Sequence, residues 1–358
     1  MALTDLKSLD KSSLREFMKN EGLPAFRAGQ LLHWMYEKNI TVIGEITEFS
    51  KTLRENLSQK AFISTLRVKE MLTSRDGTEK YLFELDDGEN FIESVLIPAD
   101  EDQANDDQNQ KTKTPRLTLC ISSQAGCAAG CLFCLTGKLG LIRNLTSREI
   151  VEQVLSVQRH ITPRKITNIV FMGMGEPLNN IENVADALRI LTELVHFSKR
   201  RITVSTSGIV PGILKLPEMA PMVNLAVSLN AATDETRNHI MPINRRYGLP
   251  SLMQALRQFP VPSRGRITFE YVLLGGINDS LADARSLVKL LHGIPSKVNL
   301  IPFNRHEGSE FHAPSAQKVL AFQKALLDSG CTAIIRKSKG ADILAACGQL
   351  KAKYELKK

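Results

Sequence analysis

Four of the six cysteines lie in one stretch of 15 residues, Cys120-Ile-Ser-Ser-Gln-Ala-Gly-Cys127-Ala-Ala-Gly-Cys131-Leu-Phe-Cys134. The last three thiolates could bind three irons of a four-iron, four-sulfur cubane, which leaves the fourth iron without a protein ligand. That iron could take the amino and carboxylate groups of a small molecule. Gly126 and Gly130 would let this loop curl tightly around such a compact cofactor. A structural zinc site is the alternative, although it would want a fourth Cys or His at ligand spacing, and none follows nearby.

From residue 116 onward, strand patterns alternate with amphipathic helices. Candidate strands are 117–122, 166–172, 202–206, 225–228, 267–274, 298–301 and 333–336, and candidate helices include 147–161, 180–195, 280–291 and 315–327. This alternation predicts an α/β fold with a parallel sheet and right-handed crossovers. Six or seven units over about 230 residues suit a partial barrel better than a closed eightfold one. Functional loops should then lie at the carboxyl ends of the strands.

The remaining chain divides by its sequence texture. Residues 1–72 read as a small helical domain, either a packing module or one that guides RNA. Residues 73–98 should form a β-hairpin, because strand-like runs at 80–85 and 90–97 flank a turn. Residues 99–115 are polar and of low complexity, which predicts a mobile acidic loop. The barrel should occupy 116–340, and a C-terminal segment carrying Cys347 should occupy 341–358.

The overall charge is positive and unevenly placed. The 358 residues include 46 Lys or Arg and 38 Asp or Glu, a formal net charge of +8. Residues 100–107 hold five acids and no base, so the rest of the chain carries 46 basic against 33 acidic residues, an excess of 13. A basic remainder favours a polyanionic partner such as nucleic acid, although basic surfaces also serve solubility.

The N-terminal residues carry scattered charges and no apolar core, and no apolar run approaches about 18 residues. We therefore expect a cytoplasmic protein that is neither secreted nor membrane-spanning. In that compartment, the cysteines indicate metal or redox chemistry rather than a disulfide framework.

A second motif, Phe171-Met-Gly-Met-Gly-Glu-Pro-Leu178, lies at the end of the second candidate strand. It fails as a dinucleotide fingerprint, because Leu178 occupies the third glycine position. Two glycines at a strand end instead let backbone carbonyls approach a ligand, and an ammonium group such as that of a methionyl moiety would donate to them. A simple turn is the alternative interpretation.

Four further residues need an interpretation. Cys347 and Cys120 could be reactive, but a lone free cysteine more often packs as a small hydrophobic residue. Cys331 reads as structural. Glu93 lies inside an apolar strand pattern, where an acid usually marks the solvated face of a hairpin.

The strings CISSQAGCAAGCLFCLTG, FMGMGEPL, STSG, MPINRRY, KVNLIPFN and AACGQL together resemble the RlmN/Cfr family of radical S-adenosylmethionine (SAM) RNA adenine methyltransferases. The resemblance spans essentially the whole chain and is greater to the RlmN branch. It implies a partial (βα)6-type radical SAM barrel with a small N-terminal helical accessory domain. It also implies methylation of carbon-2 of an adenine in the peptidyl transferase centre of 23S rRNA, and of the adenine 3′ to the anticodon in some tRNAs.

The same resemblance implies roles for individual residues. Cys127, Cys131 and Cys134 would hold one [4Fe-4S] cluster, and two molecules of S-adenosyl-L-methionine would be used per turnover. The positions that match the family's SAM site are Gly175, Glu176, Ser205, Ser228, Leu229, Asn230 and Asn304, with Asn230 standing where many relatives have His. Cys347 matches the cysteine that becomes methylated, Cys120 its disulfide-forming partner, and Glu93 the proton acceptor.

The partners implied are 23S rRNA, tRNA and an electron donor such as flavodoxin, and we expect a monomer. A Cfr-like enzyme that methylates carbon-8 shares every chemical motif and remains the first alternative. A non-catalytic iron–sulfur RNA-binding or sensor protein is the second, and it would not need Cys120 and Cys347 as a pair. The run 336–343 departs from the family's RGDDI-like pattern at Lys339 and Ala341, which bears on how firmly the segment with Cys347 is anchored.

Overall fold

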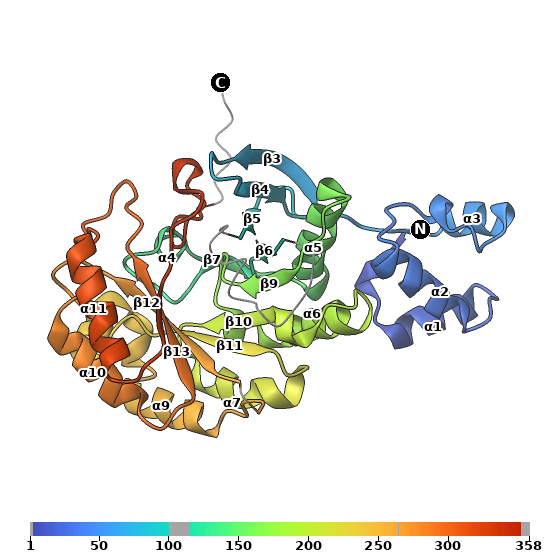
Figure 1. The fold of residues 1–358 in the computed structure, drawn as a ribbon. Helices are drawn as coiled ribbons and strands as arrows, with labels where there is room; N and C mark the ends of the chain where they lie inside the picture. Colours follow the sequence, from blue (N-terminus) through green and yellow to red (C-terminus); the bar gives the residue numbers. More distant parts are fainter. Residues whose placement is uncertain (1–2, 100–114, 264, 352–358) are drawn as a thin grey trace.

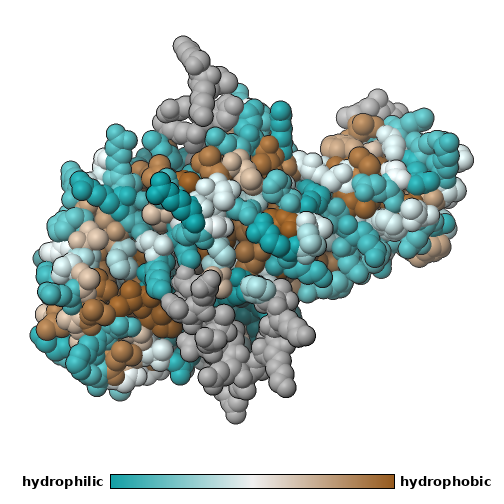
Figure 2. All heavy atoms as spheres, turned by 45° about the horizontal axis from the view of Figure 1, so that its top comes forward, coloured by the Kyte–Doolittle hydropathy of each residue, from teal (hydrophilic) through white to brown (hydrophobic). Residues whose placement is uncertain are grey.

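The computed structural model describes residues 3–99, 115–263 and 265–351. The expected acidic loop at 99–115 therefore lies, apart from its two end residues, outside the described residues. A ten-stranded sheet runs through the molecule in the order β14-β13-β12-β11-β10-β9-β6-β5-β4-β3 (Figure 1). Hydrophilic side chains cover most of the face shown in Figure 2, with apolar ones between them. Among the described residues, none of the helices combines the length and apolar character needed to cross a membrane.

Seven strands of this sheet are parallel and form the predicted partial barrel. They are β6 (Leu117–Cys120), β9 (Asn168–Phe171), β10 (Ile202–Thr206), β11 (Asn224–Ser228), β12 (Ile267–Leu273), β13 (Ser296–Pro302) and β14 (Ala333–Ile335). Each overlaps one of the candidate strands. Because β14 and β3 stand at opposite ends of the strand order, the sheet is open rather than closed.

Helices connect the parallel strands and cover the outer side of the sheet (Figure 1). They are α5 (Ser147–Ile161), α6 (Ile181–Glu193), α7 (Val210–Met219), α8 (Asp234–Ile240), α9 (Leu249–Gln258), α10 (Leu281–Leu291) and α11 (Ala316–Asp328). Local signals start several of them: Thr146 and Glu149 form a capping box on α5, and Ser280 and Asp283 form one on α10. The buried faces of the helices and the sheet share one large core.

Three antiparallel strands extend the sheet beyond β6. They are β3 (Arg67–Thr73), β4 (Glu79–Glu84) and β5 (Phe91–Pro98), and the predicted hairpin is the β4–β5 pair. The expectation that residues up to 72 are helical was wrong for β3. The reason is the Asp76-Gly77 turn, where Ser74 N donates to Thr78 O at 2.8 Å and returns the chain into a second hairpin.

The N-terminal domain consists mainly of α1 (Lys11–Asn20), α2 (Arg27–Leu32) and α3 (Lys51–Ser58). It also contains a short parallel pair, β1 (Thr4–Asp5) with β2 (Ala61–Phe62), which the sequence did not predict. The domain packs against α5 through a buried ion pair between Lys7 and Glu152. It lies to the side of the barrel (Figure 1).

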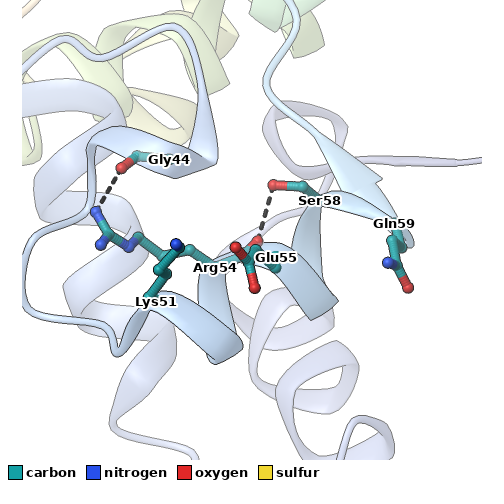
Figure 3. Close-up of a pocket in the computed structure, with 6 residues that line it drawn as sticks. All are labelled: Gly44, Lys51, Arg54, Glu55, Ser58 and Gln59. Atoms are coloured by element: carbon teal, nitrogen blue, oxygen red, sulfur yellow. Dashed lines mark hydrogen bonds between the residues drawn. The ribbon is translucent and has the colours of Figure 1, made fainter.

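A hollow of about 480 Å³ lies on this N-terminal domain (Figure 3). Two of its side chains are bonded within the domain: Arg54 Nη1 donates to Gly44 O at 2.6 Å, and Ser58 Oγ donates to Arg54 O at 2.8 Å. The hollow holds no cysteine and none of the residues singled out from the sequence.

Candidate active site

The cysteine-rich loop is built on a small antiparallel pair, β7 (Gln124–Cys127) with β8 (Gly140–Asn144), joined through the short helix α4 (Leu135–Lys138). Cys127 lies opposite Gly140. Gly126 has φ +74°, and a Cβ atom there would lie 2.0 Å from the carbonyl oxygen of Gly140. Only glycine therefore fits where the two strands approach each other.

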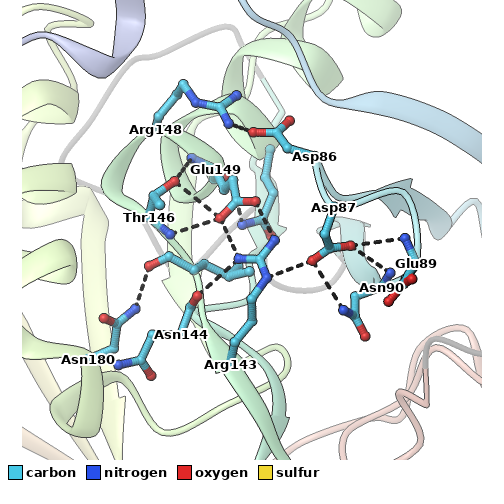
Figure 4. A network of polar contacts seen from close by, with 12 residues as sticks. Asp86, Asp87, Glu89, Asn90, Arg143, Asn144, Thr146, Arg148, Glu149 and Asn180 are labelled. Carbon is cyan, nitrogen blue, oxygen red and sulfur yellow. Dashed lines mark hydrogen bonds and ion pairs between the residues drawn. The ribbon is translucent and has the colours of Figure 1, made fainter.

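A network of polar contacts braces this hairpin (Figure 4). Arg143 of β8 binds Glu149 of α5 at 2.7 Å and Asp87 of the β4–β5 turn at 2.8 Å. Gln124 Nε2 donates to Asn144 Oδ1 at 2.7 Å. Burial alone would raise the pKa of Glu149, but hydrogen bonds from Arg143 and Thr146 outweigh it and lower that pKa below its ordinary value. The cysteine-rich loop is thus held from two sides, by α5 and by the β4–β5 turn.

Cys127, Cys131 and Cys134 lie close enough for their charges to interact. Burial raises the pKa of the Cys127 thiol to about 12 and that of Cys131 well above its usual value, so bound iron would have to displace their protons. Within the described part of the chain, no three His, Cys, Asp or Glu side chains are grouped around a single-ion site. A cubane places each thiolate on a different iron, so three partly buried cysteines on a glycine-rich loop fit its donor set.

Cys347 lies against this loop, although more than 200 residues separate them. Leu135 N donates to Gly348 O at 2.8 Å, and Thr136 Oγ1 donates to Leu350 O at 2.6 Å. Cys347 is exposed as a residue, but burial of its thiol raises the pKa of that thiol to about 12, and the charges of Cys134, Glu270 and Cys120 add to this. The structure therefore brings Cys347 near both the cluster loop and Cys120.

Cys120 and Glu93 lie on neighbouring strands. Cys120 is buried at the end of β6, and burial raises the pKa of its thiol to about 12. Glu93 is 6% exposed, pairs with Lys80 at 3.0 Å and accepts a hydrogen bond from Lys351 N at 2.8 Å. The interpretation of Glu93 as a solvated surface acid was therefore wrong. Its second contact, to the C-terminal segment, places it beside the stretch that carries Cys347.

Gly175 and Glu176 follow β9, and their environment fixes the backbone there. A Cβ atom on Gly175 would lie 2.5 Å from Gln124 Cβ. The Glu176 carboxylate accepts hydrogen bonds from Ser207 N at 2.6 Å and Leu178 N at 3.0 Å. Because these donors occupy the side chain, the backbone of Glu176 is the part most available to a ligand.

The remaining sequence-predicted SAM residues also lie at strand ends. Ser205 is near the end of β10, Ser228 ends β11 and the buried Leu229 follows it. Asn230 has φ +58°; its Oδ1 accepts from Val272 N at 2.8 Å and its Nδ2 contacts Met241 Sδ at 3.2 Å. The Asn230 side chain thus ties β11 to β12.

Comparison with known proteins decides the family. Residues 121–288 match the Radical SAM superfamily, and residues 4–63 match the ribosomal RNA large subunit methyltransferase N-terminal domain. A dual-specificity RNA methyltransferase RlmN of Geobacter sulfurreducens is 52% identical over 99% of this chain and 93% of its own length. One of Pelobacter propionicus is 51% identical over 98% and 97%. The chain belongs to the RlmN family of radical SAM RNA methyltransferases.

The fold of this RlmN family member agrees with a solved relative. The crystal structure of a radical SAM methyltransferase from Sphaerobacter thermophilus matches it with a TM-score of 0.88 and 41% identity, covering 98% of this chain and 100% of that one. The agreement extends over the barrel and the N-terminal domain together.

Three hydrogen bonds anchor the segment that carries Cys347 in this RlmN chain. Asp76 Oδ2 accepts from Gly340 N at 2.8 Å, and Asp342 accepts from Ser74 Oγ at 2.5 Å and Arg75 N at 3.2 Å. The β3–β4 turn therefore holds the segment through Asp342, even though Ala341 replaces the other acid of the family pattern. Beyond this anchor, Asn304 Nδ2 donates to Cys347 O at 3.3 Å.

Arg237 of α8 is a site residue that the sequence reasoning missed. It is fully buried beneath the ends of β10 and β11, where it donates to the carbonyl oxygens of Ser207 and Leu229. The sequence did contain one signal for Arg237. Asn244 of the string MPINRRY accepts a hydrogen bond from Arg237 Nη1 at 2.7 Å. That string indicated the family, but its asparagine had no assigned role.

Proposed function

We propose that this protein methylates carbon-2 of an adenine in 23S rRNA, and of the adenine 3′ to the anticodon in some tRNAs, through a methylated Cys347. The observation that carries the proposal is that the segment with Cys347 is hydrogen-bonded to the cysteine-rich loop and to Glu93, on the strand that pairs with the one ending at Cys120. The relatives named dual-specificity RNA methyltransferase RlmN support the RNA substrates. A cytoplasmic location and an electron donor such as flavodoxin belong to the same proposal.

The target atom explains why a radical is needed. Carbon-2 of adenine has no lone pair to attack a sulfonium methyl group, and its C–H bond is a very weak acid. Polar methyl transfer therefore fails at this position, whereas a carbon radical can add to the ring. Cys127, Cys131 and Cys134 would hold the cluster, which would supply the electron for reductive cleavage of SAM to methionine and a 5′-deoxyadenosyl radical.

Cys347 carries the carbon atom from SAM to the RNA. Its thiolate attacks the methyl carbon of one SAM and forms a new carbon–sulfur bond, while S-adenosylhomocysteine leaves with the electron pair of the broken bond. The methyl group then loses a hydrogen atom to the 5′-deoxyadenosyl radical, and the resulting methylene joins carbon-2 of adenine. Asn304, which holds the Cys347 backbone, helps to position the sulfur.

Glu93 and Cys120 complete the reaction. The adduct radical would return one electron to the cluster, which is the donor of the electron that cleaves SAM, and Glu93 accepts the ring proton. The Cys120 thiolate next attacks the sulfur of Cys347, and a disulfide forms. The electron pair of the broken carbon–sulfur bond stays with the carbon, which takes a proton and becomes the methyl group. An external reductant returns the disulfide to two thiols.

The test is a turnover assay with anaerobically reconstituted protein, SAM, dithionite and 23S rRNA. Cys347→Ala should abolish methylation and keep the cluster absorbance, whereas Cys120→Ala should retain RNA as a covalent adduct. Cys331→Ala, which removes a cysteine packed at the edge of the core, is the matched control and should keep activity.

Mass spectrometry of the modified nucleotide distinguishes carbon-2 from carbon-8. Methylation by Cys347→Ala would contradict the proposed intermediate, and free release of product from Cys120→Ala would remove Cys120 from the scheme. Full RNA binding without any turnover by the wild-type protein would favour the non-catalytic alternative.

A further inference from the structure

A positive charge is buried beneath the candidate active site. Arg237 is 0% exposed, and burial lowers the pKa of its guanidinium to about 10, so it remains charged at neutral pH. The charge of Asp234 also interacts with Arg237, but Asp234 Oδ1 accepts hydrogen bonds from Asn244 Nδ2 and Leu249 N. Among the described residues, the hydrogen-bond acceptors of Arg237 are all neutral. A buried cation without a paired anion is costly unless a nearby anion compensates it.

The acceptors are the strand ends that carry the proposed SAM site. Arg237 Nε donates to Leu229 O at 2.9 Å, and Nη2 donates to Ser207 O at 2.6 Å and Ser228 O at 3.3 Å. Nη1 donates to Asn244 Oδ1 at 2.7 Å. The planar, forked guanidinium group of Arg237 thus fixes the spacing between the ends of β10 and β11, which the single ammonium group of a lysine could not do.

The same helix contacts the cluster loop. Ile240 O, at the carboxyl end of α8, accepts a hydrogen bond from Leu132 N at 3.0 Å. The charge of Arg237 interacts with that of the Cys131 thiolate in an attractive sense. A cubane held by three thiolates is net negative and gains a further negative charge on reduction. A fixed cation at this position favours the reduced form.

We propose that Arg237 is the buried counter-charge of the cluster and a positioning residue that sets the spacing of the β10 and β11 ends. The inference rests on the proposed function, because it presupposes a cluster on Cys127, Cys131 and Cys134. Its two parts are separable: the charge acts on the reduction potential, and the fork acts on the strand ends that bind SAM. No substrate contact is assigned to Arg237.

The experiment compares the wild-type protein with Arg237→Gln and Arg237→Lys, each reconstituted without oxygen. The midpoint potential is measured by a redox titration followed by electron paramagnetic resonance, and SAM affinity by equilibrium dialysis of the oxidised protein. Arg237→Gln should disfavour one-electron reduction about tenfold, a shift of about 59 mV to lower potential. Arg237→Lys should keep the wild-type midpoint but bind SAM about tenfold more weakly, because lysine lacks the fork.

Arg285→Gln is the control, because it removes an exposed arginine of α10 and should change neither quantity. An unchanged midpoint in a fully loaded Arg237→Gln variant overturns the counter-charge, and unchanged SAM affinity in Arg237→Lys overturns the positioning role. If Arg237→Gln fails to take up iron, the test depends on Arg237→Lys, which keeps the positive charge. Loss of the cluster in both variants would overturn the charge argument. A wild-type protein that takes up far fewer than about four irons would instead contradict the proposed function.

Discussion

Gly126 shows how one residue without a side chain shapes the cluster loop. Its φ of +74° and its approach to Gly140 lie in the middle of the β7–β8 pair, directly before Cys127. Under the proposed function the cysteines supply the ligands, whereas this glycine sets the path of the backbone that leads into Cys127. The two contributions can be separated experimentally, because one concerns iron chemistry and the other concerns conformation.

Gly126→Ala should lower the free energy of unfolding by about 2 kcal/mol, because an L residue at this φ is strained and its Cβ would overlap the Gly140 carbonyl. Denaturant unfolding measures the stability, and iron per chain after reconstitution should fall in parallel. Gly29→Ala, where nothing lies within 4 Å of the added Cβ, is the control. Wild-type stability and iron content in Gly126→Ala would show that the hairpin adapts without cost.

Elements remote in sequence meet at Glu149, which joins α5 to β8 and, through Arg143, to the β4–β5 turn. The pKa of this carboxyl is lowered in the folded protein, so the folded state favours its ionised form. The stabilisation is fully present above the ordinary value of 4.5 and is lost as the pH falls through the lowered folded value. Acid should therefore weaken the brace of the cluster loop.

Glu149→Gln should cost about 2 kcal/mol near neutral pH, because it removes hydrogen bonds to a charged group. The difference between wild type and variant should shrink toward about pH 3, as measured by denaturant unfolding at several pH values. Glu182→Gln, an exposed acid in the first turn of α6, should show almost no difference at any pH. A difference for Glu149→Gln that stays constant down to that pH would exclude the ionised carboxylate as its source.

The elements that the sequence predicted well are those with local signals. The range 147–161 is the observed α5, because the Thr146–Glu149 capping box and the apolar spacing are both local. Strand β3 was missed because its pairing depends on the neighbouring hairpin. Strand β7 lies in the stretch that was expected to be a loop, because its register with β8 depends on a close glycine contact. The bonds of Arg237 to the strand-end carbonyls and the cross-strand bond of Asn230 also depend on long-range packing, so the sequence did not predict them, although the string MPINRRY contains one partner of Arg237.

The whole molecule depends on how the N-terminal domain is joined to the barrel. Lys7 reaches Glu152 in the interior of the joint, Arg159 binds the same carboxylate at 3.0 Å, and Asn39 Nδ2 donates to Leu155 O at 2.8 Å. Ion pairs buried in this way are sensitive to the loss of one partner, because the other charge remains out of water. Buried ion pairs and hydrogen bonds therefore contribute to this interface between the N-terminal domain and the barrel, in addition to apolar contacts.

Glu152→Gln should destabilise the joint by about 3 kcal/mol, since it leaves Lys7 and Arg159 without their shared carboxylate. Hydrogen exchange should become faster in α1, α2 and α3 than in the barrel strands. Lys324→Met, which breaks an exposed pair with Asp328 on α11, should leave the exchange pattern unchanged. Equal acceleration in both domains would indicate general destabilisation instead of a loosened joint.

The segment around Cys347 is moored at both ends, to the β3–β4 turn through Asp342 and to α4 through Leu350. Seven residues lie between these two attachments, and within them Asn304 binds Cys347 O and Leu135 binds Gly348 O, so the sulfur is carried by a short, held segment rather than by a separate domain. Under the proposed chemistry, the sulfur atom of Cys347 must meet SAM, the adenine ring and the Cys120 thiol in turn. A segment this short keeps the sulfur close to all three reaction partners. Loosening either attachment would disturb the order of these encounters before it prevented any one of them.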